Sequence, residues 1–362
     1  MIMAEHNKFQ NFYALIMSGG RGERFWPLST EEKPKPFLPL FNGKSLIQLT
    51  VERISKLFPL RSIFLILATE HYPVALQQLK NIPENNFIVE PCSKDTAPCA
   101  AYASLYISKM HPDATIIVFP SDHYVRNEKE FARCVRNSYT IVQKNDGIIT
   151  FGIKPTRPDT NYGYIEAGKK ISLSKNNYYY EVSEFKEKPD EHHARLYVKK
   201  SNFYWNGGIF VWKTATLMKL INQHEPLMYT ILQEINNHFG STTFTTFLEK
   251  KYHEFKSSSI DYCIMEKTKP IYMVPATFIW DDIGTWSSLF RILPGDNNKN
   301  IYLGKVTSFE TEDCLIYPDD AHILSIGIKD IIAIKHNNNI LLIHKDYAHK
   351  LKQYLKESKK KC

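Results

Sequence analysis

The chain has 362 residues, a length that fits two domains or one large α/β domain with an appendage. Hydrophobic residues make up 43% of it and charged residues 23%, a composition that excludes wholesale disorder. No apolar run approaches the roughly 18 residues that a membrane helix needs, and the first residues lack the pattern of a secretory signal. We therefore expect a cytoplasmic protein with no membrane partner.

The net charge of +8 is unevenly distributed along the chain. Residues 345–362 hold seven lysines against Asp346 and Glu357, so the rest of the chain is only weakly basic. A basic tail can contact nucleic acid or anionic lipid, but a solvated terminal helix is the simpler interpretation, and we expect no nucleic-acid partner. The six cysteines show no C-x-x-C spacing, which favours reduced thiols over a disulfide framework or a zinc site.

In the first 120 residues, short apolar runs alternate with amphipathic stretches of helical length. The predicted elements are a strand at 12–17, a helix at 46–58, strands at 62–67 and 86–89, a helix at 96–110 and a strand at 115–119. Strands separated by helices in this way indicate βαβ units and a mainly parallel sheet. After residue 150 the pattern becomes mixed, with strands predicted at 162–166, 182–187 and 205–212.

After Pro294 the character of the sequence changes. A polar loop precedes five short β-branched runs, at 305–309, 313–317, 323–328, 331–335 and 340–344, and a final helix is predicted at 345–356. We therefore divide the chain into domains at 1–294 and 295–362, the second a small all-β appendage in which no strict repeat is visible. Short strands leave open edges and apolar faces, which predicts that this appendage mediates self-association as a homodimer.

The strongest local motif is Met17-Ser-Gly-Gly-Arg-Gly-Glu-Arg-Phe-Trp-Pro-Leu-Ser29, followed by Lys33-Pro-Lys-Pro-Phe-Leu38. Glycines directly after a buried strand let several main-chain N–H groups approach an anion. Positive charge can be added by Arg21, Arg24 and Lys35. The spacing fits neither the G-x-x-x-x-G-K-[ST] phosphate loop nor the dinucleotide fingerprint. The motif predicts an anion-binding loop of another kind.

This motif resembles the signature of the sugar-nucleotide pyrophosphorylases, nucleotidyltransferases that act on sugar 1-phosphates. The Phe-Trp-Pro-Leu-Ser and Pro-Lys-Pro-Phe-Leu forms are most similar to the mannose-1-phosphate guanylyltransferase branch, also called GDP-mannose pyrophosphorylases. Six further segments resemble family motifs in the expected order: 87–97, 119–123, 155–165, 185–189, 204–210 and 280–286. Asn161, Gly207 and Asp281 depart from the family pattern, but none of them removes a charge that the chemistry needs.

The resemblance implies an α/β fold, with a Rossmann-like, GT-A-like nucleotidyltransferase sheet and a β-helix-like appendage. It also implies the transfer of GMP from GTP to mannose 1-phosphate, giving GDP-mannose and pyrophosphate. The attacking group is already an anionic phosphate oxygen, so no general base is needed. Catalysis then rests on positioning and charge neutralisation.

The resemblance assigns roles to individual residues. It implies that Asp122 and Asp282 bind Mg²⁺, the one cofactor expected. The catalytic residues would be Arg24, Lys35, Asp122 and Lys188. The nucleotide would contact Gly19, Gly20, Gly22, Arg24, Lys35, Glu90, Pro91, Thr96 and Asp122. The sugar phosphate would contact Gly163, Glu187, Lys188 and Asn206.

Four alternatives remain open from the residues alone. Glu90 could bind a ribose hydroxyl in place of guanine, and Asn206 could be a turn residue before a buried strand. The chain could use another sugar 1-phosphate or another nucleotide, since specificity can change with little trace in the sequence. It could also be a catalytically silent sugar-nucleotide sensor on the same fold. A silent relative would be expected to lose a charged site residue, and all of them are present.

Overall fold

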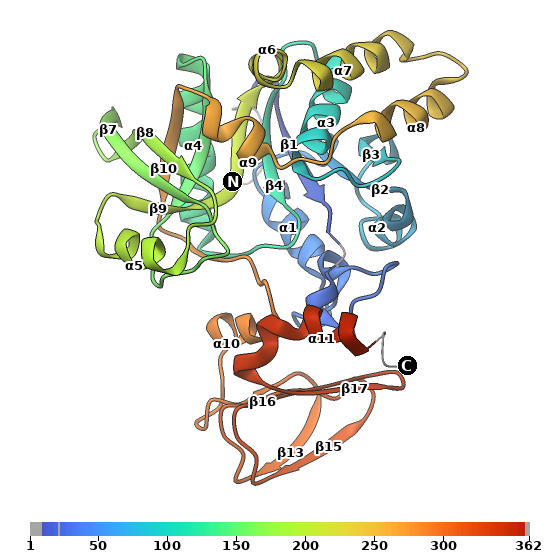
Figure 1. Cartoon of the computed structure of the whole chain (residues 1–362), viewed down its shortest axis with the longest axis vertical. Helices are drawn as coiled ribbons and strands as arrows, with labels where there is room; N and C mark the ends of the chain where they lie inside the picture. Colours follow the sequence, from blue (N-terminus) through green and yellow to red (C-terminus); the bar gives the residue numbers. More distant parts are fainter. Residues whose placement is uncertain (1–8, 21, 359–362) are drawn as a thin grey trace. The chain divides into compact units, whose positions relative to one another are not determined.

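The computed structural model describes residues 9–20 and 22–358 (Figure 1). These form two compact units. The first unit holds residues up to 19, residues 51–121 and residues 125–280. The second unit holds residues 20–50, 122–124 and 281 onward. Arg21 and Cys362, both considered above, lie outside the described residues.

A nine-stranded mixed sheet organises the first unit, with strand order β3-β2-β1-β4-β9-β6-β10-β8-β7. Strands β1 to β4 pair in parallel, as do β6 and β10, whereas β9, β8 and β7 pair antiparallel with their neighbours. The predicted Rossmann-like, mainly parallel fold is thus confirmed. The strands are β1 (Phe12–Ser18), β2 (Ile63–Ala68), β3 (Phe87–Glu90), β4 (Thr115–Pro120), β6 (Ile148–Ile153), β7 (Tyr164–Ser174), β8 (Asn177–Lys186), β9 (Phe203–Lys213) and β10 (Ile271–Ala276).

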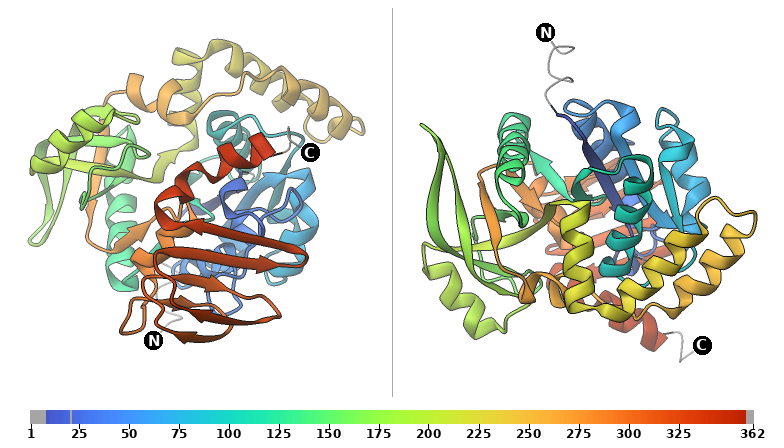
Figure 2. Two further views of the ribbon diagram at one scale, coloured as in Figure 1. Left: turned by 60° about the horizontal axis from the view of Figure 1, so that its bottom comes forward. Right: turned by 90° about the horizontal axis from the view of Figure 1, so that it is seen from above.

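Helices cover both faces of this sheet. Successive side chains of a strand point to opposite faces. On β4, Ile116 and Val118 join the core formed with α3 and α6, whereas Phe119 contacts Phe131 of α4 with ring centroids 5.6 Å apart. Figure 2 shows α4 across the sheet from α3 and α6. The helices are α1 (Leu46–Ser55), α2 (Tyr72–Gln78), α3 (Thr96–Met110), α4 (Glu128–Lys144), α5 (Glu191–Lys199), α6 (Thr214–His224), α7 (Pro226–His238), α8 (Phe244–Glu254) and α9 (Ile260–Cys263).

The second unit contains the predicted β-helix-like module. Strands β12 (Ile301–Tyr302), β14 (Leu315–Tyr317) and β16 (Ile331–His336) pair in parallel. A second parallel pair is formed by β13 (Lys305–Phe309) and β15 (His322–Ile326), and β17 (Asn339–His344) pairs antiparallel with β16. The register joins Ile301 to Leu315 and Leu315 to Ile332, steps of 14 and 17 residues. These unequal steps explain why no strict repeat is visible in the sequence.

The remaining elements are short. The predicted final helix is divided into a 3-10 segment (Lys345–Lys350) and helix α11 (Leu351–Ser358), and α10 (Leu289–Ile292) precedes the strands of the second unit. A separate two-stranded sheet pairs β5 (Tyr124–Arg126) with β11 (Ile279–Asp281). No disulfide joins the cysteines between residues 9 and 358, which are free thiols.

The glycine-rich segment and the C-terminal strands share one hydrophobic core. Phe25, Leu38 and Leu40 belong to the same buried cluster as Trp286 and Leu351. The hydrophobic core beneath the strands that follow residue 295 therefore includes side chains from residues 25–46. This shared core holds the glycine-rich segment, the segment after residue 281 and the last helix in one unit.

Candidate active site

Lys35 lies at the centre of a polar cluster in the second unit. It begins a short 3-10 turn between Pro34 and Leu38 and is only 8% exposed. Its Nζ donates a hydrogen bond to Asp122 Oδ2 at 2.7 Å and another to the main-chain carbonyl oxygen of Asp282. The structure thus gathers three predicted site residues, although Lys35 and Asp282 are 247 positions apart.

Gly22 permits this arrangement of Lys35. Its φ is +62°, in the left-handed region that glycine adopts without strain. A Cβ at this position would lie 2.5 Å from the main-chain nitrogen of Lys35 and 2.8 Å from its Cβ. Any side chain here would therefore push Lys35 away from Asp122. Gly19 and Gly20 lie exposed in the loop after β1.

Trp286 anchors the segment that carries Asp282. Its ring is fully buried, lies 5.0 Å from the ring of Phe25, and donates a hydrogen bond from Nε1 to the carbonyl oxygen of Trp26 at 3.1 Å. The aromatic residues of two motifs far apart in the sequence thus pack together. This contact fixes residues 281–286 beside the glycine-rich segment.

The two neighbouring aspartates, Asp281 and Asp282, have different surroundings. Asp281 is buried, and its carboxylate accepts hydrogen bonds from Arg291 at 2.7 and 2.9 Å and from the N–H of Ile283. Asp282 instead lines a pocket, and its carboxylate oxygens lie 3.2 and 3.5 Å from the place of a Cβ on Gly284. The missing side chain at Gly284 leaves the Asp282 carboxylate accessible, which suits a ligand-binding role.

The pocket has a volume of about 360 Å³ and is lined by three of the predicted anion-binding residues, Gly22, Arg24 and Lys35. Arg24, an exposed residue of the 3-10 turn Glu23–Phe25, contributes a second cation beside Lys35. The lining residues are Gly22, Glu23, Arg24, Phe25, Lys35, Asp282, Gly284 and Lys352. A cavity with several cations and main-chain N–H groups is suited to a polyphosphate.

Asp122 is ionised at neutral pH. Burial alone would raise the pKa of its carboxyl group, but the positive charges of Lys35 and His123 and the hydrogen bond from Lys35 lower the pKa below its usual value. No group of three or more His, Cys, Asp or Glu side chains with metal-ligand geometry occurs in residues 9–20 and 22–358. Two carboxylates combined with substrate phosphates and water are nevertheless a common Mg²⁺ environment. Asp122 and the accessible Asp282 fit that donor set.

The predicted nucleobase residues lie in the first unit, at the end of β3 and the start of α3. Asp95 caps α3 by accepting a hydrogen bond from the N–H of Thr96 at 2.7 Å. Thr96 Oγ1 in turn accepts a hydrogen bond from the N–H of Ile260 at 2.9 Å, and the N–H of Ala97 donates to the carbonyl oxygen of Ser258. Residues 258–260 are therefore tied to this loop. Pro91 lies partly exposed just before it.

Glu90 is buried and paired with a tyrosine. It is 2% exposed, and its Oε2 accepts a hydrogen bond from Tyr252 Oη at 2.7 Å. Burial raises the pKa of this carboxyl group to about 7, against the opposing effect of the hydrogen bonds from Tyr252 and Cys99. Tyr252 was not identified from the sequence because it lies 162 positions away, on a helix with no motif of its own.

The raised pKa of Glu90 predicts a stability that falls as pH rises. In the unfolded chain this group titrates near its ordinary value of 4.5, so between about pH 4.5 and pH 7 the folded state holds more protons. We expect the free energy of unfolding of the wild type, relative to Glu90→Gln, to fall by about 3 kcal/mol from pH 4 to pH 8. Urea unfolding at both pH values measures this difference. Glu249→Gln, at an exposed position, is the control and should show no such difference.

Glu187 and Gly163 approach each other closely on the predicted sugar side of the first unit. A Cβ on Gly163 would lie 2.4 Å from Glu187 Oε2, so a side chain there would displace this carboxylate. The Glu187 side chain is 8% exposed, and burial, followed by the negative charge of Asp261, raises its pKa to about 7. Lys188 Nζ lies 3.5 Å from Glu187 Oε1, and its own side chain is 57% exposed. Lys188 is thus available to a solvent-borne anion.

Asn206 positions a carboxylate that the sequence analysis missed. Its Nδ2 donates a hydrogen bond to Asp261 Oδ1 at 3.0 Å, while its Oδ1 accepts from Thr150 Oγ1 and from the N–H of Gly208. Burial raises the pKa of Asp261. Because Asp261 follows the segment bonded to Thr96, the structure brings the predicted nucleobase residue Thr96 and the predicted sugar residue Asn206 close to one segment. Asp261 is a single acidic residue outside any motif, so the sequence alone gave no indication that it lies beside Asn206.

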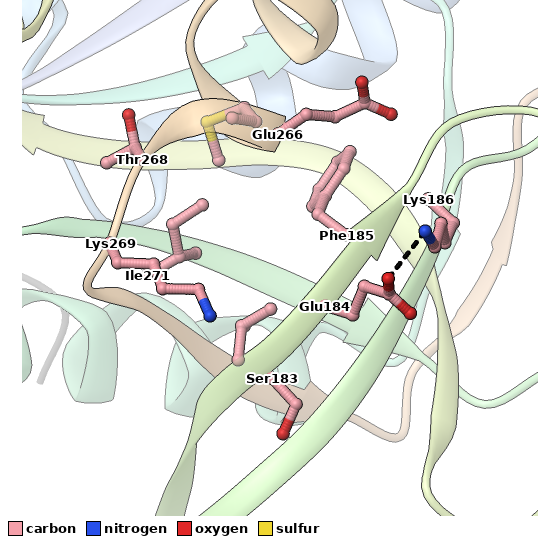
Figure 3. Close-up of a pocket in the computed structure, with 10 residues that line it drawn as sticks. Ser183, Glu184, Phe185, Lys186, Glu266, Thr268, Lys269 and Ile271 are labelled. Carbon is pink, nitrogen blue, oxygen red and sulfur yellow. Dashed lines mark ion pairs between the residues drawn. The ribbon is translucent and has the colours of Figure 1, made fainter.

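A pocket of about 370 Å³ lies behind the Phe185–Pro189 motif, between β8 and the segment 265–271 (Figure 3). Glu184 and Lys186 form an ion pair of 2.6 Å at its edge, and Glu266 Oε1 accepts a hydrogen bond from the N–H of Glu187 at 3.1 Å. Two lysines and two glutamates line this pocket, so their formal charges cancel. It therefore supports the backbone of Glu187 and is poorly suited to bind phosphate.

The predicted catalytic residues are divided between the two units. Arg24, Lys35 and Asp122 belong to the second unit, where Lys35 contacts Asp122 and lines one pocket with Arg24. Lys188 belongs to the first unit, where it lies beside Glu187. The predicted catalytic side chains of the second unit therefore lie close together, and the one in the first unit lies beside a predicted sugar-binding residue.

The chain belongs to the nucleotidyl transferase family, whose sequences match residues 13–299. Residues 304–357 match the MannoseP isomerase/GMP-like beta-helix domain. The family resemblance predicted from the motifs is thus confirmed, and the protein is a nucleotidyltransferase.

Relatives with these domains include a mannose-1-phosphate guanylyltransferase of Escherichia coli, 33% identical over 346 residues that cover 93% of this chain and 74% of the relative. A crystal structure from Thermus thermophilus, described as a mannose-1-phosphate geranyltransferase, matches with a TM-score of 0.87 at 32% identity and covers 97% of this chain and all of that one. A mannose-6-phosphate isomerase from Helicobacter pylori matches with a TM-score of 0.60 at 25% identity over 75% of this chain and all of that one.

Within residues 9–20 and 22–358, no helix combines the length and the apolar composition that a membrane span requires.

Proposed function

We propose that this protein transfers GMP from GTP to mannose 1-phosphate, giving GDP-mannose and pyrophosphate. The observation that carries this proposal is the cluster in which Lys35 contacts Asp122 and the main chain of Asp282, in a pocket that Arg24 also lines. The choice of GTP and mannose 1-phosphate is supported by the relatives named for this reaction, and by the Phe-Trp-Pro-Leu-Ser form of the signature.

The reaction forms a bond between a phosphate oxygen of the sugar and the α-phosphorus of the nucleotide, and it breaks the bond from that phosphorus to the leaving pyrophosphate. The main obstacle is repulsion between two anions. Lys35, buried and held in place by its partners, supplies a fixed positive charge at the phosphates. Arg24 and the main-chain N–H groups of the glycine-rich loop would bind the pyrophosphate portion.

Mg²⁺ is part of this proposal as the cofactor. Asp122 and Asp282 would hold it, and when bound it would neutralise charge on the phosphate oxygens. The support from the structure is the donor set: the Asp122 carboxylate is bonded to Lys35, and Asp282 lines the pocket that Lys35 also lines. Lys35 is bonded to the Asp122 side chain and to the Asp282 main chain, so its movement would be coupled to both residues.

The sugar phosphate is assigned to Lys188 and the sugar hydroxyl groups to Glu187, with Asn206 and the newly identified Asp261 beside them. Lys188 offers a compact, exposed charge, and Gly163 leaves space that a side chain would take from Glu187. Guanine presents N–H donors, so its recognition needs acceptors. Glu90 and the main chain near Pro91 are the proposed acceptors, and Thr96 shapes the loop around them.

A matrix of nucleoside triphosphates and sugar 1-phosphates tests the substrate assignment. Pyrophosphate release by the purified protein is expected to be fastest with GTP and mannose 1-phosphate, and to stop when EDTA removes the metal. A clear preference for UTP or dTTP with glucose 1-phosphate would instead assign the protein to another branch of the family. Absence of turnover with every pair would favour the silent sensor.

The β-helix-like module is proposed to join two chains as a homodimer. Phe309 and Ile326 are register neighbours on β13 and β15, and both are more than half exposed. Ile340 and Leu342 on β17 are exposed in the same way. Exposed apolar side chains in such numbers favour association. Light scattering at micromolar concentration should give the mass of two chains, and a monomeric mass would contradict the proposal.

A further inference from the structure

The last helix of the chain contributes a lysine to the phosphate pocket. Lys352, the second residue of α11, lines the same pocket of about 360 Å³ as Arg24 and Lys35. From the sequence, this residue belongs to a Lys-rich tail for which a solvated helix was the simplest expectation. The structure places it beside the glycine-rich segment, more than 300 positions earlier in the chain.

The position of Lys352 is set by the packing of its neighbour. Leu351 is 3% exposed and belongs to the hydrophobic core that also contains Phe25 and Trp286. The side chain of the next residue, Lys352, is thereby directed to the glycine-rich segment. Its Nζ lies 2.8 Å from Glu23 Oε2, an ion pair between the helix and the residue that immediately precedes Arg24.

The net charge of the pocket lining indicates how Lys352 would affect the binding of a triphosphate. Without Lys352, the cations Arg24 and Lys35 are balanced by the carboxylates Glu23 and Asp282, and the described lining has no net charge. The Glu23 carboxylate would then repel a triphosphate that Arg24 and Lys35 attract. Lys352 neutralises Glu23 and leaves one positive charge in excess.

We propose that Lys352 is a nucleotide-binding residue of the phosphate pocket, where it offsets the charge of Glu23 and favours the triphosphate of the substrate and the pyrophosphate product. The proposal rests on the proposed function for the identity of these ligands. It assigns a role to the C-terminal helix that is separate from self-association.

The test compares Lys352→Met with the wild type. Methionine keeps much of the aliphatic stem and removes the charge, and the side chain is 49% exposed, so the fold should survive. We expect the KM for GTP and the Kd for inorganic pyrophosphate, measured by calorimetry at low salt, each to rise about fivefold. The kcat and the KM for mannose 1-phosphate should change by less than about twofold. Salt should reduce the difference between the two proteins, because it screens half-exposed charges.

Rescue by a second substitution distinguishes charge compensation from a packing effect. If Lys352 acts by offsetting Glu23, Glu23→Gln in the Lys352→Met background should restore pyrophosphate affinity to within about twofold of the wild type. Lys356→Met, one turn further along α11 and outside this pocket, is the matched control and should leave both constants unchanged.

Two results would overturn the inference: unchanged pyrophosphate affinity in Lys352→Met, or the same loss in the double variant as in the single one. Pyrophosphate binding is measured without turnover. A wild type that binds pyrophosphate but forms no GDP-mannose would therefore count against the proposed function alone. An active wild type with an unaffected Lys352→Met would count against this inference alone.

Discussion

Replacing Lys35 by alanine is expected to lower kcat by roughly a hundredfold or more, the effect of losing one preorganised charge at a reacting phosphate. The residue is 8% exposed and held by Asp122 and by the main chain of Asp282, so it is already in place before the substrate arrives. Steady-state pyrophosphate release at saturating GTP measures the loss. Circular dichroism and thermal unfolding establish that the variant is folded.

Lys33 provides a matched control for this experiment. It lies two positions before Lys35 in the same motif, but it is exposed. Lys33→Ala should keep turnover within about twofold of the wild type. Near-normal turnover in a folded Lys35→Ala variant would show that Lys35 does not contribute to catalysis, despite its contacts.

Asp122→Asn and Asp282→Asn are each expected to reduce turnover by about a hundredfold or more, because asparagine keeps the shape and removes the charge that would hold Mg²⁺. The two effects should not add, since losing either ligand already destroys a shared site. The double variant should therefore be about as slow as the slower single variant. Turnover of the two single variants and the double variant, measured over a Mg²⁺ titration, reports both the loss of activity and its non-additivity.

Asp281 is the control that the structure supplies. Its carboxylate is committed to Arg291 and to the N–H of Ile283, so Asp281→Asn should lower the thermal unfolding temperature and leave the Mg²⁺ midpoint unchanged. If Asp282→Asn kept near-normal activity and Mg²⁺ dependence while Asp281→Asn lost both, the assignment of the second carboxylate would be wrong.

The parallel part of the sheet and helix α3 were predictable because their signals are local. β1, β2 and β4 are short apolar runs, and α3 is a mostly apolar, buried stretch of helical length between a capping Asp95 and the next polar loop. The position of β9 between β4 and β6 was not predictable. It depends on antiparallel pairing between segments about 50 to 100 residues apart, for which a single sequence offers no register.

The site shows the same division between local and long-range information. Gly22, Arg24 and Lys35 belong to one recognisable motif, so the prediction that they bind an anion could be made from the sequence. The choice between Asp281 and Asp282 depends on Arg291, and the role of Asp261 depends on Asn206, 55 positions away. Lys352 looked like part of a basic tail because its partner Glu23 lies at the other end of the chain.

Isotopic labelling of GTP tests the central claim most directly. With Mg²⁺ and mannose 1-phosphate present, ³²P in the α-phosphate of GTP should appear in GDP-mannose, and ³²P in the γ-phosphate should appear in pyrophosphate. This pattern requires attack at the α-phosphorus, the step to which Lys35, Asp122 and Asp282 are assigned. Transfer of the γ-label to the sugar, or no labelled sugar nucleotide at all, would contradict the account.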